Sequence, residues 1–126
     1  MFKQEKGFTL IELIMVIVLL GLLAVVAIPQ YTNLQVEAKQ SATLGVVGGV
    51  RSGIYTKYAA NLAQGVTPAY PATLGGAKAL CSTANPCFGD VLSQPVTQDW
   101  ECTTAGLAYK GPNGITYTYD GAGAFQ

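Results

Sequence analysis

Glu12 is the residue whose type and position most clearly require a chemical explanation. Residues 6–29 read KGFTLIELIMVIVLLGLLAVVAIP, and almost every side chain from Phe8 to Ile28 is a hydrocarbon. A charged group at the midplane of a bilayer costs about 2.5–3.5 kcal/mol on insertion scales. A buried carboxylate without a partner is costly, whereas a paired one roughly breaks even. Glu12 therefore needs either a route to the membrane interface or a partner of opposite charge.

The cysteines are the second group with chemical potential. Cys81, Cys87 and Cys102 all lie in the distal half of the chain. If that half is exported, one disulfide is expected and one thiol is left over. Cys81 and Cys87 flank the turn-prone stretch STANP, which favours this pair, while a Cys87–Cys102 bond would close a longer loop. The remaining alternative is three reduced cysteines that pack as small hydrophobic side chains.

Charge and composition exclude several classes of site. The chain has 126 residues, a net charge of zero and no His, and no cluster of Lys or Arg follows residue 7. It therefore lacks the electrostatic footprint of a nucleic-acid-binding protein, and a metal site with nitrogen and sulfur ligands is not expected. No pair of carboxylates and no serine with a base forms a catalytic pattern. The sequence predicts neither an enzyme nor a cofactor.

The apolar run is long enough to cross a membrane. Its 21 residues, Phe8–Ile28, make a helix of about 32 Å, which matches a hydrocarbon core of about 30 Å. Lys3 and Lys6 precede the run, and such basic residues hold the adjoining end of a first span in the cytoplasm. The rest of the chain is therefore expected to cross outward.

Two other interpretations of this segment stay open. In a cleavable secretory signal, the small residues at 25–27, VVA, would mark the cleavage site. The apolar run is longer than the usual apolar region of a signal peptide, and a signal peptide gains nothing from a carboxylate such as Glu12 within that region. A plain single-pass anchor explains the length of the run but leaves Glu12 unexplained.

The helical pattern continues beyond the apolar run. Apolar side chains recur at steps of three and four residues, namely at Val47, Val50, Ile54, Tyr58 and Leu62. Four glycines between 45 and 53 weaken this helix, so two shorter helices are an alternative. Pro29 lies inside the helix, where it removes a hydrogen bond and predicts a bend. We expect one helix over about residues 8–62, bent near Pro29.

The distal part predicts a small antiparallel sheet. Residues 64–81 are expected to form a loop with up to one helical turn, and NPCFGDVL a short helix with Asn85 as its cap. Period-two patterns around Trp100, in LAYKG and in ITYTYDG predict strands, and GPNG at 111–114 predicts a turn. Ile115, Tyr117 and Tyr119 should face one way and Thr116, Thr118 and Asp120 the other. The predicted class is α+β, with three or four strands packed on the C-terminal half of the helix.

The stretch KGFTLIELI resembles the N-terminal processing and methylation motif of type IV pilins and of the pseudopilins of type II secretion. The resemblance covers about residues 6–29 and rests on Gly7, Phe8, Thr9, Glu12 and the unbroken apolar segment. It implies cleavage by a prepilin peptidase between Gly7 and Phe8, and methylation of the new amine of Phe8. It also implies that Glu12 pairs with the Phe8 amine of a neighbouring subunit, so that the charge pair sets the register of assembly.

The resemblance also implies a division of the chain and a set of partners. Residues 1–7 would be a cleaved leader, 8–29 a transmembrane and filament-core helix, 30–62 an amphipathic half-helix and 63–126 a globular head. The partners implied are further copies of the chain in a helical homopolymer, the prepilin peptidase, membrane lipid, and an inner-membrane assembly platform with its ATPase. Some pseudopilins hold calcium in their C-terminal loop, which makes Asp99 and Asp120 alternative calcium ligands.

The function implied is that of a type IV pilin subunit with a role in adhesion, motility or DNA uptake. The subunit would lie in the inner membrane with its N-terminus in the cytoplasm, and after assembly in a filament at the cell surface or in the periplasm. The first alternative is the major pseudopilin of a type II secretion system. The second is a soluble binding domain secreted behind an ordinary signal peptide.

Overall fold

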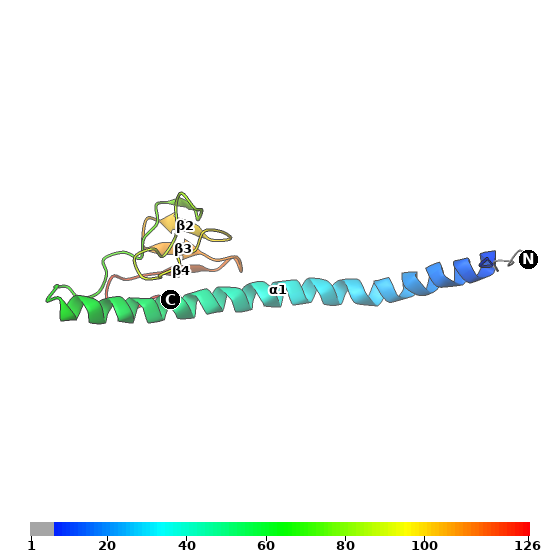
Figure 1. Cartoon of the computed structure of the whole chain (residues 1–126), viewed down its shortest axis with the longest axis horizontal. Helices are drawn as coiled ribbons and strands as arrows, with labels where there is room; N and C mark the ends of the chain where they lie inside the picture. The colour runs from blue at the N-terminus through cyan, green and yellow to red at the C-terminus, as the bar shows by residue number, and fades with distance from the viewer. Residues whose placement is uncertain (1–6) are drawn as a thin grey trace, which may run out of the picture. The chain divides into compact units, whose positions relative to one another are not determined.

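A computed structural model describes residues 7–126 of the chain, so most of the predicted leader, residues 1–6, lies outside the described part. One long helix, α1 (Leu10–Ala63), is followed by a sheet of four short strands. The strands are β1 (Ala79–Leu80), β2 (Glu101–Thr104), β3 (Ala108–Lys110) and β4 (Thr116–Thr118) (Figure 1). The predicted α+β class is confirmed. The chain forms two compact units, Met1–Glu37 and Ala38–Gln126, and α1 contributes to both.

The first unit contains the apolar part of α1. The helix runs through Pro29 without a break in its assignment, and the hydroxyl of Thr32 donates a hydrogen bond to the carbonyl oxygen of Pro29 at 2.8 Å. The predicted bend at Pro29 stays a prediction. All apolar side chains from Phe8 to Val36 are exposed, as described with the candidate site below.

In the second unit, one face of α1 enters the core of the head. Its buried residues are Thr43, Val47, Val50 and Ile54. Their spacing of three and four residues places them on one side of the helix, as the sequence predicted for the last three. Leu62 is 52% exposed, so the prediction for this residue was wrong. The polar neighbour Asn61 turns toward the head instead, where its amide nitrogen donates to the carbonyl oxygen of Ala69 at 2.7 Å.

The sheet is antiparallel throughout, in the order β1-β2-β3-β4. Cys102, Tyr109 and Tyr117 lie side by side across β2, β3 and β4, and all three are buried. The predicted GPNG turn is confirmed, because Gly111 and Ile115 pair through a hydrogen bond of 2.9 Å and Gly114 has a φ of 82°. Ile115 is 54% exposed and not inward as predicted, because it still belongs to the turn and precedes β4.

Two predictions for the segment before β2 were wrong. The predicted loop over 64–81 contains β1, and the predicted short helix over NPCFGDVL is a series of turns with an isolated bridge between Cys87 and Val96. The side chain of Asn85 does not cap a helix; it bonds the main chain at Ala77 and Leu80. Ala77 and Leu80 lie outside the segment NPCFGDVL, so contacts that the local pattern does not contain override its helix signal.

Aromatic residues fill the core between α1 and the sheet. The ring of Phe88 lies 4.1 Å from that of Tyr109, 5.3 Å from that of Trp100 and 5.8 Å from that of Phe125, measured between centroids. Phe88 has a φ of 62°, which is uncommon for a residue with a side chain. Its side chain is fully buried, so packing of the ring offsets the cost of this backbone conformation.

Two contacts fix α1 against the rest of the head. A Cβ atom added to Gly53 would clash with the carbonyl oxygen of Val91, so the absence of a side chain is what permits this close approach. Arg51 donates a hydrogen bond from Nε to the carbonyl oxygen of Phe125 at 2.9 Å. The head, which Figure 1 shows against the C-terminal half of α1, therefore has both a packed and a hydrogen-bonded connection to the helix.

Candidate functional site

The candidate site lies where α1 begins, at Gly7–Glu12. Thr9 precedes the first helical residue, Leu10, and Glu12 is the third residue of the helix. The main-chain N–H and the hydroxyl of Thr9 both donate to Oε2 of Glu12, each at 2.8 Å. The main-chain N–H of Glu12 in turn donates to the hydroxyl oxygen of Thr9 at 3.3 Å. This reciprocal arrangement is a capping box, which satisfies the free N–H groups at a helix start.

The capping box changes the account of Glu12. The sequence led us to expect a partner in the Phe8 amine of a neighbouring subunit, but the structure shows that Oε2 already has two donors within its own chain. Among residues 7–126, no hydrogen bond reaches Oε1, so this oxygen can accept a further donor. The signal was present in the letters TLIE, because a Thr followed three residues later by a Glu before an apolar run marks a helix N-terminus. The sequence analysis missed it.

Gly7 and Phe8, the residues of the predicted cleavage, are open to solvent. The Phe8 side chain is 91% exposed, and no atom of residues 7–126 lies within 4 Å of a Cβ atom added to Gly7. Both residues border a shallow surface groove together with Thr9 and Glu12. The peptide bond between Gly7 and Phe8 thus lies just before the helix, in backbone that an enzyme can bind in extended form.

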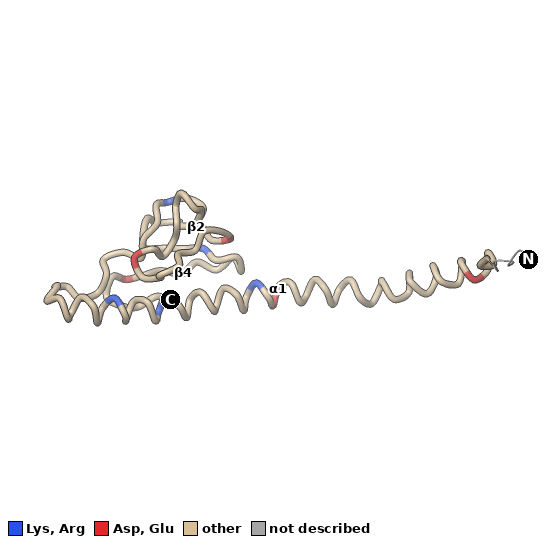
Figure 2. The backbone as a smooth tube through the Cα atoms, in the orientation of Figure 1, with Lys and Arg blue, Asp and Glu red and all other residues tan. Residues whose placement is uncertain are grey.

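The helix behind this site has the character of a membrane span. Glu12 is the only charged residue between Gly7 and Val36, and Figure 2 shows this part of α1 almost without charge. A window of the helix reaches a mean hydropathy of 3.1, and none of that window is buried in the chain. By length and composition the helix can cross a membrane. Such an exposed apolar surface requires lipid or other apolar helices around it.

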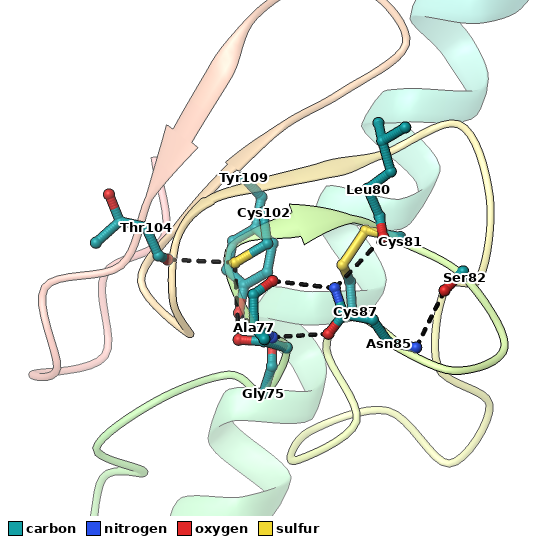
Figure 3. The surroundings of a disulfide bond; sticks show 11 residues. Gly75, Ala77, Leu80, Cys81, Ser82, Asn85, Cys87, Cys102, Thr104 and Tyr109 are labelled. Carbon is teal, nitrogen blue, oxygen red and sulfur yellow. Dashed lines mark hydrogen bonds between the residues drawn. A yellow bond between two sulfur atoms is a disulfide. The ribbon is translucent and has the colours of Figure 1, made fainter.

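The remaining predicted site residues lie in the head. Cys81 and Cys87 form a disulfide, with a Cα–Cα distance of 5.5 Å, and this is the pair favoured from the sequence (Figure 3). Cys102 is a buried free thiol. Oδ1 of Asp120 accepts hydrogen bonds from the N–H groups of Ala122 at 2.7 Å and Ala124 at 3.0 Å, so this carboxylate organises a turn.

The calcium alternative gains no support from these positions. Within residues 7–126, no three side chains of the His, Cys, Asp and Glu types are grouped to hold a metal ion. Asp99 has a φ of 62° and lies in a loop next to the buried Trp100. Asp99 and Asp120 as calcium ligands stay a hypothesis from the resemblance alone.

Comparison with known proteins agrees with these observations. The model of the prokaryotic N-terminal methylation motif matches residues 2–28. The chain is 44% identical over 56 residues to a type IV major fimbrial protein, FimA, of Dichelobacter nodosus, a match over 44% of this chain and 36% of the relative. It is 38% identical over 76 residues to the fimbrial protein EcpC of Eikenella corrodens, over 60% of this chain and 48% of the relative.

A relative from a secretion system matches over a longer range. The type II secretion system core protein G of Pseudomonas aeruginosa is 34% identical over 86 residues, which cover 67% of this chain and 56% of the relative. The chain thus spans between about a third and just over half of the length of these relatives. No solved structure matches significantly. The methylation motif, the exposed apolar helix and these relatives together support the type IV pilin and type II secretion pseudopilin family for this chain.

Proposed function

We propose that the chain is a structural subunit of a type IV pilus, which polymerises after its leader is removed and its new N-terminus is methylated. The observation that carries the proposal is the combination of an exposed apolar helix with a single carboxylate at its start. Before assembly, lipid surrounds the helix in the inner membrane, with the N-terminus in the cytoplasm. In the filament, other copies of the same helix take the place of lipid.

Processing between Gly7 and Phe8 suits the geometry of this segment. Gly7 is unencumbered and Phe8 is exposed, so the scissile bond is accessible to a prepilin peptidase. Cleavage converts the main-chain nitrogen of Phe8 into a cationic amine directly before Thr9. Methylation by the same enzyme leaves this positive charge in place. Cleavage thereby creates a positive group that can serve as a partner for Glu12.

The capping box makes Glu12 suitable for pairing with a neighbouring subunit. Two donors from Thr9 hold Oε2, which fixes the plane of the carboxylate and leaves Oε1 to the methylated amine of an adjacent copy. A wrongly placed subunit would leave the remaining charge without compensation in an apolar surrounding, which is costly. The pair therefore selects the axial register of each incoming subunit.

The proposal assigns a different task to each of three parts of the chain. Residues 8–29 form the membrane and filament-core helix, residues 30–62 the amphipathic half, and residues 63–126 the head that other molecules meet. The assembly platform and its ATPase would move the subunit from membrane to filament. Adhesion, motility or DNA uptake would then be functions of the finished fibre.

A pseudopilin of a type II secretion system is the second candidate function. The observation that favours it is the match to core protein G, which extends over 67% of this chain and so reaches beyond the N-terminal helix. A pseudopilin shares the processing and the helix-core assembly, but its filament remains in the periplasm. Fibres on the cell surface, seen by negative-stain microscopy, separate the pilin from the pseudopilin.

The central experiment compares Glu12→Val with Gly7→Val in cells that carry a prepilin peptidase. Mass spectrometry of the unaltered protein should show a chain that begins at N-methylated Phe8. Glu12→Val should insert into the membrane and be cleaved but fail to assemble, because the acid is absent. Gly7→Val should insert but retain its leader, because the side chain obstructs the peptidase. Normal filament yield from Glu12→Val, or a mature chain that begins near Ile28, would refute the proposal; the latter result indicates a secreted domain.

A further inference from the structure

One edge of the sheet in the head is closed by a side chain and not by a strand. β1 is the first strand in the order of the sheet, so only β2 pairs with it. The N–H of Cys81 donates to the carbonyl oxygen of Trp100 on the β2 side. Main-chain groups alternate sides along a strand, so the carbonyl of Leu80 points to the free side. Such an unpaired edge is a template for pairing with another chain.

The side-chain amide of Asn85 contacts Leu80 on this edge and Ala77, which lies two residues before β1. Its Oδ1 accepts a hydrogen bond from the N–H of Ala77 at 2.8 Å, and its Nδ2 donates to the carbonyl oxygen of the same residue at 3.0 Å. Nδ2 also lies 3.3 Å from the carbonyl oxygen of Leu80, to which it donates. The amide therefore presents the donor and acceptor that a peptide group of a neighbouring strand would present. Figure 3 shows these contacts beside the disulfide.

The loop that carries Asn85 is fixed on both sides. Ser82 and Asn85 exchange main-chain hydrogen bonds of 3.0 and 3.1 Å, which close the loop upon itself. The disulfide between Cys81 and Cys87 joins the residues that flank this loop, and both cysteines are buried. The main chain of Cys87 is further held to Val96 by two hydrogen bonds, of 2.8 and 2.9 Å. The disulfide thus limits how far Asn85 can move away from the edge.

The opposite edge of the sheet is closed in the ordinary way. Thr118 of β4 donates to the carbonyl oxygen of Gln126 at 2.7 Å and accepts from the N–H of Gln126 at 3.1 Å. The C-terminal segment therefore pairs with β4 as a short strand would. The β1 edge has no equivalent segment of main chain among residues 7–126, and the amide of Asn85 is what occupies it.

We propose that Asn85 is a positioning residue that closes the β1 edge, and that the Cys81–Cys87 disulfide keeps it there. When the amide or the disulfide is lost, the segment 77–80 becomes open to antiparallel pairing with the same segment of a second copy. A second copy is the fitting occupant because an antiparallel pair of identical edges satisfies both chains by the same hydrogen bonds. The device prevents heads that are brought close together from joining through their sheets.

Asn85→Asp is the sharpest variant because it keeps the size and shape of the side chain. A carboxylate can still accept from the N–H of Ala77, but it replaces Nδ2 with an oxygen that faces the carbonyl oxygens of Ala77 and Leu80. Two favourable contacts thereby become repulsive. Asn113→Asp is the matched control. Asn113 also makes two side-chain hydrogen bonds, to Tyr117 and Ile115, but it lies in the turn between β3 and β4.

The experiment uses the full chain in detergent micelles and two readouts. Hydrogen exchange, followed by NMR, should show the amide of Ala77 exchanging about tenfold faster in Asn85→Asp, since repulsion from the carbonyl oxygens of Ala77 and Leu80 displaces the carboxylate from this position. A short amine-reactive cross-linker should join Lys78 of one copy to Lys78 of another, because Lys78 is exposed within the opened segment. Links between Lys57 residues, on α1, report association of any other kind.

The expected result is faster exchange at Ala77 and new Lys78–Lys78 links in Asn85→Asp, neither of which Asn113→Asp shows. Loss of the disulfide in a Cys81→Ala, Cys87→Ala variant should produce the same two changes with Asn85 intact. Unchanged exchange at Ala77 in Asn85→Asp overturns the proposal. An equal increase in the exchange rate of the main-chain amide of Tyr109, in the core, also overturns it, because the variant would then have destabilised the whole head. Neither readout depends on leader cleavage or filament formation.

Discussion

Oε2 of Glu12 lies 2.8 Å from both the main-chain nitrogen and the hydroxyl oxygen of Thr9. The carboxylate that makes the apolar helix unusual therefore has a structural task within its own chain, since it completes the first turn of α1. It also retains an oxygen for a second partner. In the proposed filament, Thr9 would therefore act on assembly through Glu12, as a residue that orients the carboxylate without contacting the neighbouring subunit itself.

Thr9→Val should impair assembly more than Thr9→Ser. The valine side chain has nearly the shape of threonine, but it neither donates to Oε2 of Glu12 nor accepts from the main-chain N–H of Glu12, and loss of such a cap costs about 1 kcal/mol. Serine retains the hydroxyl. We expect equal amounts of membrane-inserted, cleaved protein in both variants and a reduced yield of sheared filaments for Thr9→Val alone. Equal yields would show that the capping box has no part in assembly.

Gly53→Ala and Gly48→Ala should have opposite effects on the head. The new methyl group at position 53 would meet the carbonyl oxygen of Val91, which cannot move without displacing the loop, and overpacking of this kind costs about 1–3 kcal/mol. At position 48 nothing lies within 4 Å, so alanine should stabilise the helix by up to about 1 kcal/mol. Urea unfolding of both variants, followed by tryptophan fluorescence of Trp100, measures the difference. Equal stabilities would contradict the close approach at Gly53.

The three cysteines should differ in their reactivity toward an alkylating reagent. The folded protein should remain unlabelled, because Cys102 is buried and Cys81 and Cys87 are bonded to each other. Denaturation without a reductant should give a single label, located at Cys102 by peptide mass spectrometry. A label on Cys81 or Cys87 under these conditions would show that the disulfide pairs differently or does not form in cells.

The head should lose stability in alkaline solution. Burial raises the pKa of Tyr109, with smaller contributions from the charges of Cys102 and Asp90, and burial likewise raises the pKa of Tyr119. A phenol in the unfolded chain ionises near pH 10, whereas these two remain protonated in the folded head. The folded state then binds more protons than the unfolded one, so the free energy of unfolding falls as the pH rises above about 10.

Tyr109→Phe tests this account of the alkaline range. Phenylalanine loses the hydrogen bond that the phenol donates to the carbonyl oxygen of Gly75, so the variant should be less stable than the unaltered protein at pH 7. Because the variant lacks one of the two tyrosines with a raised pKa, its stability should depend less on pH between about 9 and 11. Urea titrations at several pH values measure both the loss of stability at pH 7 and the slope of the free energy of unfolding with pH. An unchanged slope would mean that Tyr109 does not contribute to the alkaline loss.

The architecture could be predicted wherever a pattern is local and periodic. The buried face of α1 at Val47, Val50 and Ile54 follows from helical spacing, and the turn before β4 follows from the letters GPNG. The favoured disulfide followed from a short turn-prone loop between Cys81 and Cys87. Each of these features is set by residues close to one another in sequence, so the letters alone carry enough information.

The errors arose where a distant partner decides the local structure. Leu62 continues the apolar stripe in the sequence, but its side chain is exposed in the structure. The neighbouring Asn61 contacts the head instead, through a hydrogen bond to the main chain of the following loop. Asn85 and Pro86 read as the start of a helix, but the amide of Asn85 bonds Ala77 and Leu80 instead. Neither partner could be identified from the residues around the position itself.

The sequence by itself determined the apolar helix with its single acid, the position of the processing motif and the α+β class, because hydrophobic periodicity and short motifs act over a few residues. Only the tertiary structure decided which donors Glu12 meets, why Gly53 admits no side chain and how Asn85 closes the sheet. These features depend on distances between atoms that the chain brings together only after it folds, where a few tenths of an ångström separate a hydrogen bond from a clash.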